Sequence, residues 1–293
     1  MSSLLTNTSA MTALQSLTQT QRYMNTTENQ ISTGLAITSA ADNASYWSIA
    51  TQMNSDIGAL GAVNSALSES QSMIATMTTA MQSTISVMDA IKNDLTTAQQ
   101  PGASLTKIQT DITAQQNALL SIGQSASFNG QNYLETTGGT VNLVSSYSAA
   151  NGVSFLSLNT TNTALFNATT GATSGILGVS GAAYTAASIL TLNITAATSG
   201  DLANMLTDVQ TAISSITSAA STLGSMTTNL TTQQNYISNL SDSLTTGVGS
   251  LVDANMNEAA TRLAALQVQQ QLGVQALSIS NSNTQLILKL FGL

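Results

Sequence analysis

The sequence has no cysteine and no histidine in 293 residues, a single proline, a single tryptophan and only 6% charged residues. Without cysteine there is no disulfide or thiolate chemistry, and without histidine the usual imidazole bases and metal ligands are missing. The thirteen carboxylates do not cluster as metal ligands or acid–base pairs would, and Asp42, Asp56, Glu69 and Asp89 are expected at solvated helix positions. We therefore expect no enzyme activity, no catalytic residue, no metal and no cofactor.

Basic residues are also scarce, and the formal net charge is −8 with a pI of about 4.1. The five cations, scattered along the chain, are Arg22, Lys92, Lys107, Arg262 and Lys289. Too few positive charges are present to neutralise a phosphate backbone, so nucleic-acid binding is excluded.

Long apolar runs are missing as well. No segment reaches the ~20 apolar residues that span a bilayer, so we expect no membrane partner. The N-terminus lacks the basic region and apolar run of a cleavable secretory signal, since its first cation is Arg22. The sequence thus predicts either a cytoplasmic protein or export by a route that reads an uncleaved N-terminus.

Hydrophobic residues make up 42% of the chain, yet the mean hydropathy is only +0.16, because Ser, Thr, Asn, Gln and Ala replace the charged residues. A surface of uncharged amides and hydroxyls repels its own copies weakly. This composition suits a protein that packs densely against identical neighbours. An unusual secreted domain of low charge is the alternative.

The N-terminal half follows a heptad rhythm. Alternating steps of three and four residues from Leu14 to Leu35 meet an apolar residue at five of seven positions, and from Met53 to Leu95 at nine of thirteen. Pro101-Gly102 then interrupts the pattern, before a shorter stripe from Leu105 to Ile122. These patterns predict a long helix, a turn and a returning helix.

The C-terminal third shows the same rhythm more cleanly. From Leu202 to Leu251, thirteen of fifteen stepped positions are apolar or Ala, and Asp201 is an acidic residue where a helix would start. The stripe resumes from Leu263 to Leu290.

The centre of the chain differs, because no charged residue occurs from Thr136 to Gly200. Short alternating runs such as 141–144, 153–158 and 189–194, with glycine turns such as Asn151-Gly152, are typical of short strands. A disordered low-complexity insertion is the competing interpretation.

These patterns predict a mainly α fold, in which both chain ends form a long antiparallel helical coiled-coil rod that carries a small β-rich outer insertion. The predicted parts are terminal helices at 1–40 and 255–293, a helical rod at 41–135 and 201–254, and a small variable outer domain at 136–200. A seam helix buries one face only, so such a chain has little core for its length and its apolar ends would aggregate if left exposed.

We therefore expect the terminal segments to pack between subunits of a polymer. The candidate subunit-packing residues are Leu4, Leu5, Met11, Leu14, Leu17, Met24, Ile31, Leu35, Leu263, Leu266, Val274, Leu277, Ile287, Leu290 and Phe291.

Several runs resemble the bacterial flagellins, in particular those of α-proteobacteria. Residues 31–44, ISTGLAITSAADNA, are similar to the family's N-terminal signature, and residues 126–130, ASFNG, resemble its Phe-Asn-Gly turn. At the C-terminus, residues 259–266 and the closing Leu288–Phe291 are similar to the family's terminal helix. The resemblance covers residues 1–135 and 200–293, with the uncharged insertion between them.

The resemblance implies a structural subunit that polymerises into the extracellular filament of the bacterial flagellum for swimming motility. It implies an inner tube made by the two terminal segments, a surrounding helical layer and a variable outer domain. It also implies uncleaved type III export and, besides other copies of the chain, three kinds of partner: a flagellin export chaperone, a filament cap and hook–filament junction proteins.

Two alternatives stay open. A hook–filament junction protein has similar terminal helices, and a secreted membrane-active coiled-coil effector would need a basic amphipathic helix or a hydrophobic hairpin, which the sequence lacks. Ser104 and Lys107 match the Ser-x-x-Lys pattern of acyl-enzymes, but the partner motifs of those enzymes are missing, so we interpret the match as chance.

Overall fold

The computed structural model describes residues 7–167, 174–185 and 187–290, with side chains as far as 282. The chain forms two compact units, Met1–Ile57 with Asp242–Leu293 and Gly58–Ser241, so both long helices α2 (Ala44–Ala98) and α4 (Ser199–Val252) contribute to each unit. The predicted class is confirmed, because the described chain is mainly helical with antiparallel helix pairs from both chain ends and a small stranded insertion. Within that described part, no helix is both long and apolar enough to cross a membrane.

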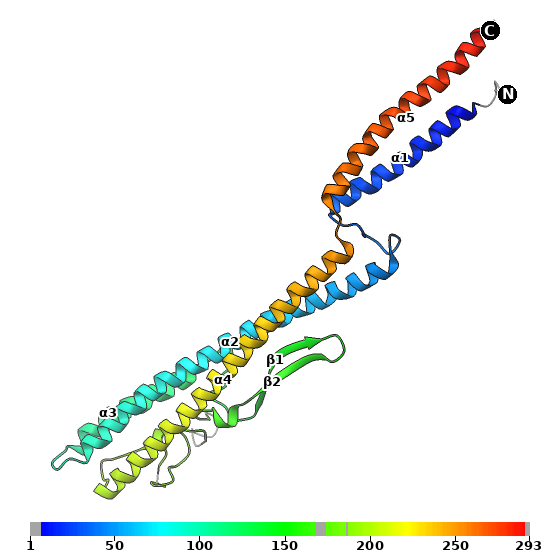
Figure 1. The fold of residues 1–293 in the computed structure, drawn as a ribbon. Coiled ribbons are helices and arrows are strands. Elements are labelled where there is room, and N and C mark those ends of the chain that lie inside the picture. Colours follow the sequence, from blue (N-terminus) through cyan, green and yellow to red (C-terminus); the bar gives the residue numbers. More distant parts are fainter. Residues whose placement is uncertain (1–6, 168–173, 186, 291–293) are drawn as a thin grey trace. The chain divides into compact units, whose positions relative to one another are not determined.

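The first unit contains α1 (Thr8–Thr33) and α5 (Met256–Leu290), which lie side by side (Figure 1). Helix α1 starts where the Asn7 side chain accepts the backbone N–H of Ala10 at 3.0 Å. It ends at Gly34, whose φ of 75° only glycine adopts readily, and whose N–H donates to the Gln30 carbonyl. Both boundaries are therefore set by local sequence.

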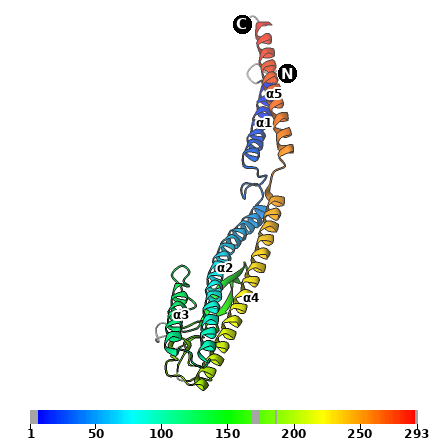
Figure 2. The same cartoon turned by 90° about the vertical axis from the view of Figure 1, so that its left-hand side faces the viewer.

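In the second unit, α2 and α4 pair along their length, and α3 (Leu105–Ser125) returns beside α2 (Figures 1 and 2). The α2–α4 pair is antiparallel, since Gln234 donates to the Ser68 hydroxyl at 2.9 Å and accepts from Gln71 at 3.3 Å. The turn predicted at Pro101-Gly102 is present, and Gly102 has φ of 83°. The start of α4 is capped reciprocally, because Asp201 accepts the N–H of Thr198 and donates its own N–H to the Thr198 hydroxyl.

The predicted stripes form the core of this unit. The fully buried large side chains of α2 include Leu60, Leu67, Ile74, Met77, Met81, Met88, Ile91 and Leu95. Those of α4 include Met205, Val209, Ile216, Leu223, Leu230 and Ile237. Three helices thus share one apolar interior, which α3 completes with Ile112 and Leu119.

The insertion contains one hairpin, β1 (Thr140–Ser148) and β2 (Gly152–Asn159), followed by a 3-10 turn, η1 (Thr160–Asn162). Two of the three predicted runs form these strands, and Gly152, which follows the connecting turn and begins β2, has φ of 72°. Beyond the hairpin, Phe166 is fully buried, and a Cβ at Gly123 would overlap its ring. Helix α3 therefore needs glycine at this position so that the insertion can pack against it.

The prediction of a third strand at 189–194 is wrong. This segment begins with a short 3-10 helix, η3 (Ile189–Thr191), and α3 side chains hold it in place of a neighbouring strand. Gln116 donates to the carbonyls of Ile189 and Leu192 at 2.9 and 3.0 Å, and Gln109 accepts the N–H of Ile194 at 2.7 Å. Side-chain amides satisfy the polar groups that a β-ladder would otherwise pair.

Replacing Gln116 by Ala should release this segment. The Ile189 carbonyl would lose its Gln116 donor, and the Leu192 carbonyl would keep only its longer bond of 3.3 Å from Gln109, so we expect the free energy of unfolding of the second unit to fall by about 1–3 kcal/mol. Hydrogen exchange at 189–194 should rise, as measured by mass spectrometry. Asn117→Ala, at an exposed position of the same helix, is the control. Equal exchange in the two variants would show that apolar packing alone holds the segment.

Candidate assembly surface

The α1–α5 pair buries one face of each helix, and the buried or half-buried positions follow alternating steps of three and four residues. On α1 this seam comprises Ala10, Ala13, Leu17, Thr20, Met24, Thr27 and Ile31. On α5 it comprises Ala259, Leu263, Leu266, Gln270, Gly273, Leu277 and Ser280. The spacing is that of an antiparallel coiled coil.

About half of the seam positions are small or polar. The Gln270 amide donates to Gln21 at 2.8 Å, and the Asn7 amide donates to the Ser280 carbonyl at 3.1 Å. A Cβ at Gly273 would lie 3.3 Å from Leu17 Cδ1, so the helices approach closely at this point. Few large apolar side chains are buried, and the pair therefore gains little stability from the seam.

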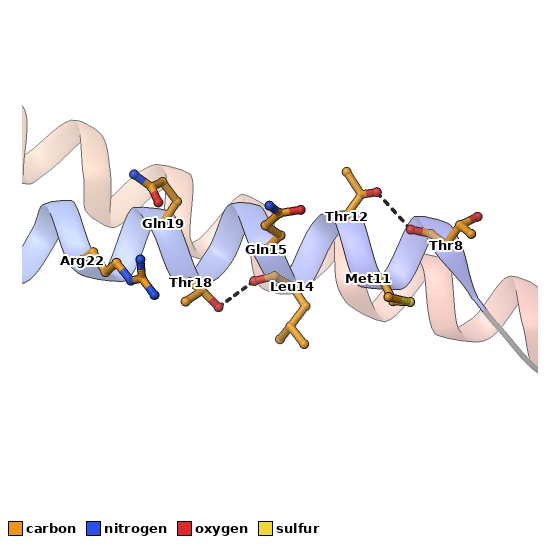
Figure 3. Close-up of a pocket in the computed structure, with 8 residues that line it drawn as sticks. All are labelled: Thr8, Met11, Thr12, Leu14, Gln15, Thr18, Gln19 and Arg22. Carbon is orange, nitrogen blue, oxygen red and sulfur yellow. Dashed lines mark hydrogen bonds between the residues drawn. The ribbon is translucent and has the colours of Figure 1, made fainter.

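The outward face of α1 carries exposed apolar side chains (Figure 3). Met11 is 64% exposed and Leu14 54% exposed, and both line a surface hollow of about 590 Å³. The described residues that line it are Thr8, Met11, Thr12, Leu14, Gln15, Thr18, Gln19 and Arg22. The Thr12 and Thr18 hydroxyls donate to the carbonyls one turn back, at 3.0 and 2.8 Å. The hydroxyl donors of both threonines are thus used within the helix, and this face is less polar than its sequence suggests.

A second exposed stripe lies on α5. Val268, Leu272 and Ile279 are 55%, 58% and 62% exposed. At 100° per residue they share one side of the helix, roughly 150° away from the seam around Leu266. Together with the outward face of α1, this α5 stripe gives the helix pair two apolar surfaces that are exposed among the described residues.

The sequence-predicted packing residues fall into distinct groups. Leu17, Met24, Ile31, Leu263, Leu266 and Leu277 lie on the intramolecular seam, whereas Met11, Leu14 and Val274 are exposed. Ile287 and Leu290 belong to α5, but their side chains, like Leu4, Leu5 and Phe291, lie outside the described residues. Of the positions that the predicted heptad pattern visits from Leu14 to Leu35, only every second one lies on the seam. Sequence reasoning missed Val268, Leu272 and Ile279, which a test for a second stripe on α5 would have found.

Leu35, also a predicted packing residue, lies in the link between α1 and α2. Leu35 and Ile37 pack against a small cluster formed by Ala50, Val248 and Val252. Backbone bonds tie the link to the end of α4, since the Ala36 N–H donates to the Val252 carbonyl at 2.7 Å.

Asp42 is exposed, as the sequence suggested, but it holds a turn within this link and does not lie in a helix. Its carboxylate accepts four hydrogen bonds of 3.0–3.1 Å, from the backbone N–H and hydroxyl groups of Thr38 and Ser39. The backbone donor of Thr38, followed by that of Ser39, lowers the pKa of Asp42 below its usual value of 3.8. Among the described residues no three carboxylates gather as a metal site would require.

Comparison with known proteins agrees with this terminal organisation. The model of the bacterial flagellin N-terminal helical region matches residues 4–138, and that of the C-terminal helical region matches residues 206–291. The chain is 39% identical to Flagellin C of Rhizobium meliloti (strain 1021), over 99% of both chains. It is 41% identical to a flagellin of Brucella melitensis biotype 1, again over 99% of both chains. A crystal structure of Bacillus cereus flagellin is 16% identical with a TM-score of 0.44, covering 58% of this chain and 86% of that one.

Gly273 offers a test of the seam. In Gly273→Ala, the Leu17 methyl can move by a few tenths of an ångström, and alanine favours helix by about 1 kcal/mol over glycine, so α1 should stay in place. In Gly273→Phe, the ring cannot fit beside Leu17, and α1 should separate from α5. Hydrogen exchange of α1 should increase in the phenylalanine variant only. Equal protection in both would mean that the close approach is not needed.

The turn at Asp42 should respond to acid. Because the folded pKa is lowered, the carboxylate's contribution to stability is complete above the unfolded value of about 4 and is lost as the pH falls through the folded pKa. An NMR titration should place the Asp42 pKa below 3.8, and amide protection at Thr38 and Ser39 should fall over the same range. In Asp42→Asn the protection should be lower at neutral pH and lack this transition. A normal Asp42 pKa would contradict the role of the four bonds.

Proposed function

The chain belongs to the bacterial flagellin family, and we propose on this basis that its terminal segments 1–40 and 255–293 form the inner tube of a filament. The protein is a structural subunit that polymerises with its own copies into the flagellar filament, which lies outside the cell and serves swimming motility. We place residues 41–135 and 201–254 in a surrounding helical layer and residues 136–200 in a variable outer domain. Membership of a family of structural subunits indicates a non-enzymatic role.

The observation that supports this arrangement most directly is the pair of apolar faces that stay exposed among the described residues. The seam covers one side of α1 and of α5, and leaves Met11 and Leu14 on one surface and the α5 stripe on the other. Contact between two different surfaces of identical subunits builds a ring when the rotation between them closes and an open helical filament when it does not, and we propose the second case here. Each Val, Leu, Ile or Met side chain that becomes fully buried contributes about 1.5–3 kcal/mol.

Low charge favours the same packing. In the described part of α1 the charged residues are Arg22 and Glu28, and copies meeting along these faces would bury few charges. The predicted packing residues Met11, Leu14 and Val274 fit contacts between subunits, while Leu17, Met24 and Leu266 position the helices that present them.

We propose the export and capping partners from the family membership. A free subunit that exposes the α5 stripe is prone to aggregate, and a flagellin export chaperone on the C-terminal segment would cover it. Uncleaved type III export, assembly beneath a filament cap and attachment through hook–filament junction proteins complete the proposed pathway. Nothing in the molecule favours the alternatives, a junction protein or a membrane-active effector, over a filament subunit.

A seeded polymerisation assay tests the proposal. Purified chain added to filament fragments should form long tubes, while a variant lacking residues 1–40 should not. Leu272→Gln should raise the critical concentration roughly tenfold or more, because a buried leucine is lost from each contact. Leu272→Met, which keeps the volume and apolar character, should polymerise nearly normally.

The subunit itself should fold equally well in both Leu272 variants, since this side chain is exposed in the chain alone. Circular dichroism provides that check. If Leu272→Gln assembled at the wild-type critical concentration, the α5 stripe would not be a subunit contact. If the intact chain stayed monomeric with seeds, the terminal segments would not be assembly elements.

A further inference from the structure

The methionines of the chain differ sharply in their exposure. Most are buried, with relative exposures of 8% or less: Met24, Met73, Met77, Met81, Met88, Met205 and Met226. Met53 is half-buried, while Met256 is 44% exposed and Met11 64% exposed. Among the described residues, Met11 therefore has the most accessible thioether.

The surroundings of Met11 connect this accessibility with assembly. Its side chain lies on the outward face of α1 with Leu14, along the hollow shown in Figure 3. Because the chain has no cysteine, no thiol competes for two-electron oxidants, and thioether sulfur is the natural target. The most oxidisable sulfur thus lies on a surface that the proposed function buries.

We propose that Met11 is a redox modification site of the unassembled subunit, at which a hydroperoxide forms the sulfoxide and thereby keeps the chain out of the filament. The inference rests on the proposed function. A sulfur lone pair attacks one peroxide oxygen, the O–O bond breaks and an S–O bond forms. With hydrogen peroxide the proton on the transferred oxygen passes to the other oxygen, which leaves as water, and sulfur loses the two electrons that the peroxide gains.

The sulfoxide acts by changing the polarity of the packing face. Methionine is apolar and adaptable, whereas its sulfoxide carries a strong acceptor oxygen that needs a donor when buried. The neighbouring Thr12 and Thr18 hydroxyls already donate to the carbonyls of Thr8 and Leu14. Burying the oxidised side chain against another copy therefore costs the desolvation of its oxygen and of any donor that it takes from Gln15, Gln19 or Arg22, while the same contact between reduced chains protects Met11 from oxidant.

The experiment uses the full chain and hydrogen peroxide, with peptide mapping by mass spectrometry and seeded polymerisation as readouts. In the free subunit, Met11 should be oxidised several-fold faster than Met24, and in filaments its oxidation should slow on the order of tenfold. Subunits fully oxidised at Met11 should show a critical concentration raised about tenfold or more.

Three variants test whether oxidation of Met11, and of no other methionine, blocks assembly. Met11→Leu should polymerise normally and keep doing so after peroxide treatment, since leucine preserves the apolar volume. Met256→Leu should remain peroxide-sensitive, and Met11→Gln, a polar side chain of similar length, should assemble poorly without oxidant. Normal assembly of chains carrying Met11 sulfoxide, or equal Met11 oxidation in subunits and filaments, would overturn the inference. Failure of the untreated wild-type chain to assemble would instead overturn the proposed function.

Discussion

The pairing of α1 with α5 along a single seam is the interaction on which the rest of the molecule's behaviour depends. Each helix buries one side against the other, and much of that side is Ala, Thr, Gln, Gly or Ser. The apolar residues that would strengthen the pair, such as Leu14 and Leu272, point away from it. The second unit differs, because α2, α3 and α4 enclose Met81, Leu119 and Leu223 completely. A well-packed helical unit is thus joined to a helix pair whose seam buries few large apolar side chains and leaves others exposed.

In place of charged residues, the helices carry many threonine and serine side chains. Many of their hydroxyls donate to the carbonyl four residues earlier, as Thr18 does to Leu14 and Thr217 does to Ile213. Such side chains need no partner from water or from a neighbour, so they can be buried between subunits at little desolvation cost. A surface of this kind stays hydrated in the free chain and still allows dense packing.

The sequence predicted the helices well because their apolar stripes are long and because residues with strong backbone preferences mark the turns of the chain. Pro101-Gly102 and Asn151-Gly152 fix turns by their own backbone preferences, and the core positions of α2 and α4 follow the stepped pattern. The terminal pair was harder, since the stepping favoured Leu14 whereas the structure packs Ala13 and Thr20 on the seam. Periodicity identifies large apolar residues, and it cannot distinguish a seam within one chain from a face that meets another. The strand prediction for 189–194 was wrong for a different reason. The hydrogen-bond partners of this segment are Gln109 and Gln116, which lie far away in sequence.

Besides buried side chains such as Phe166, hydrogen bonds from helix side chains to the backbone of the insertion hold it in place. Gln116 binds backbone carbonyls of 189–192, and Asp208 on α4 accepts the backbone N–H groups of Ala183 and Tyr184. Because helix side chains hold the backbone of the insertion, its sequence can change while the attachment survives, provided that small residues remain where the helices come close. The flagellin models agree with this division, since one ends at residue 138 and the other begins at residue 206. The regions that the family models match are therefore mainly helical, and the segment between them, 139–205, lies outside both models.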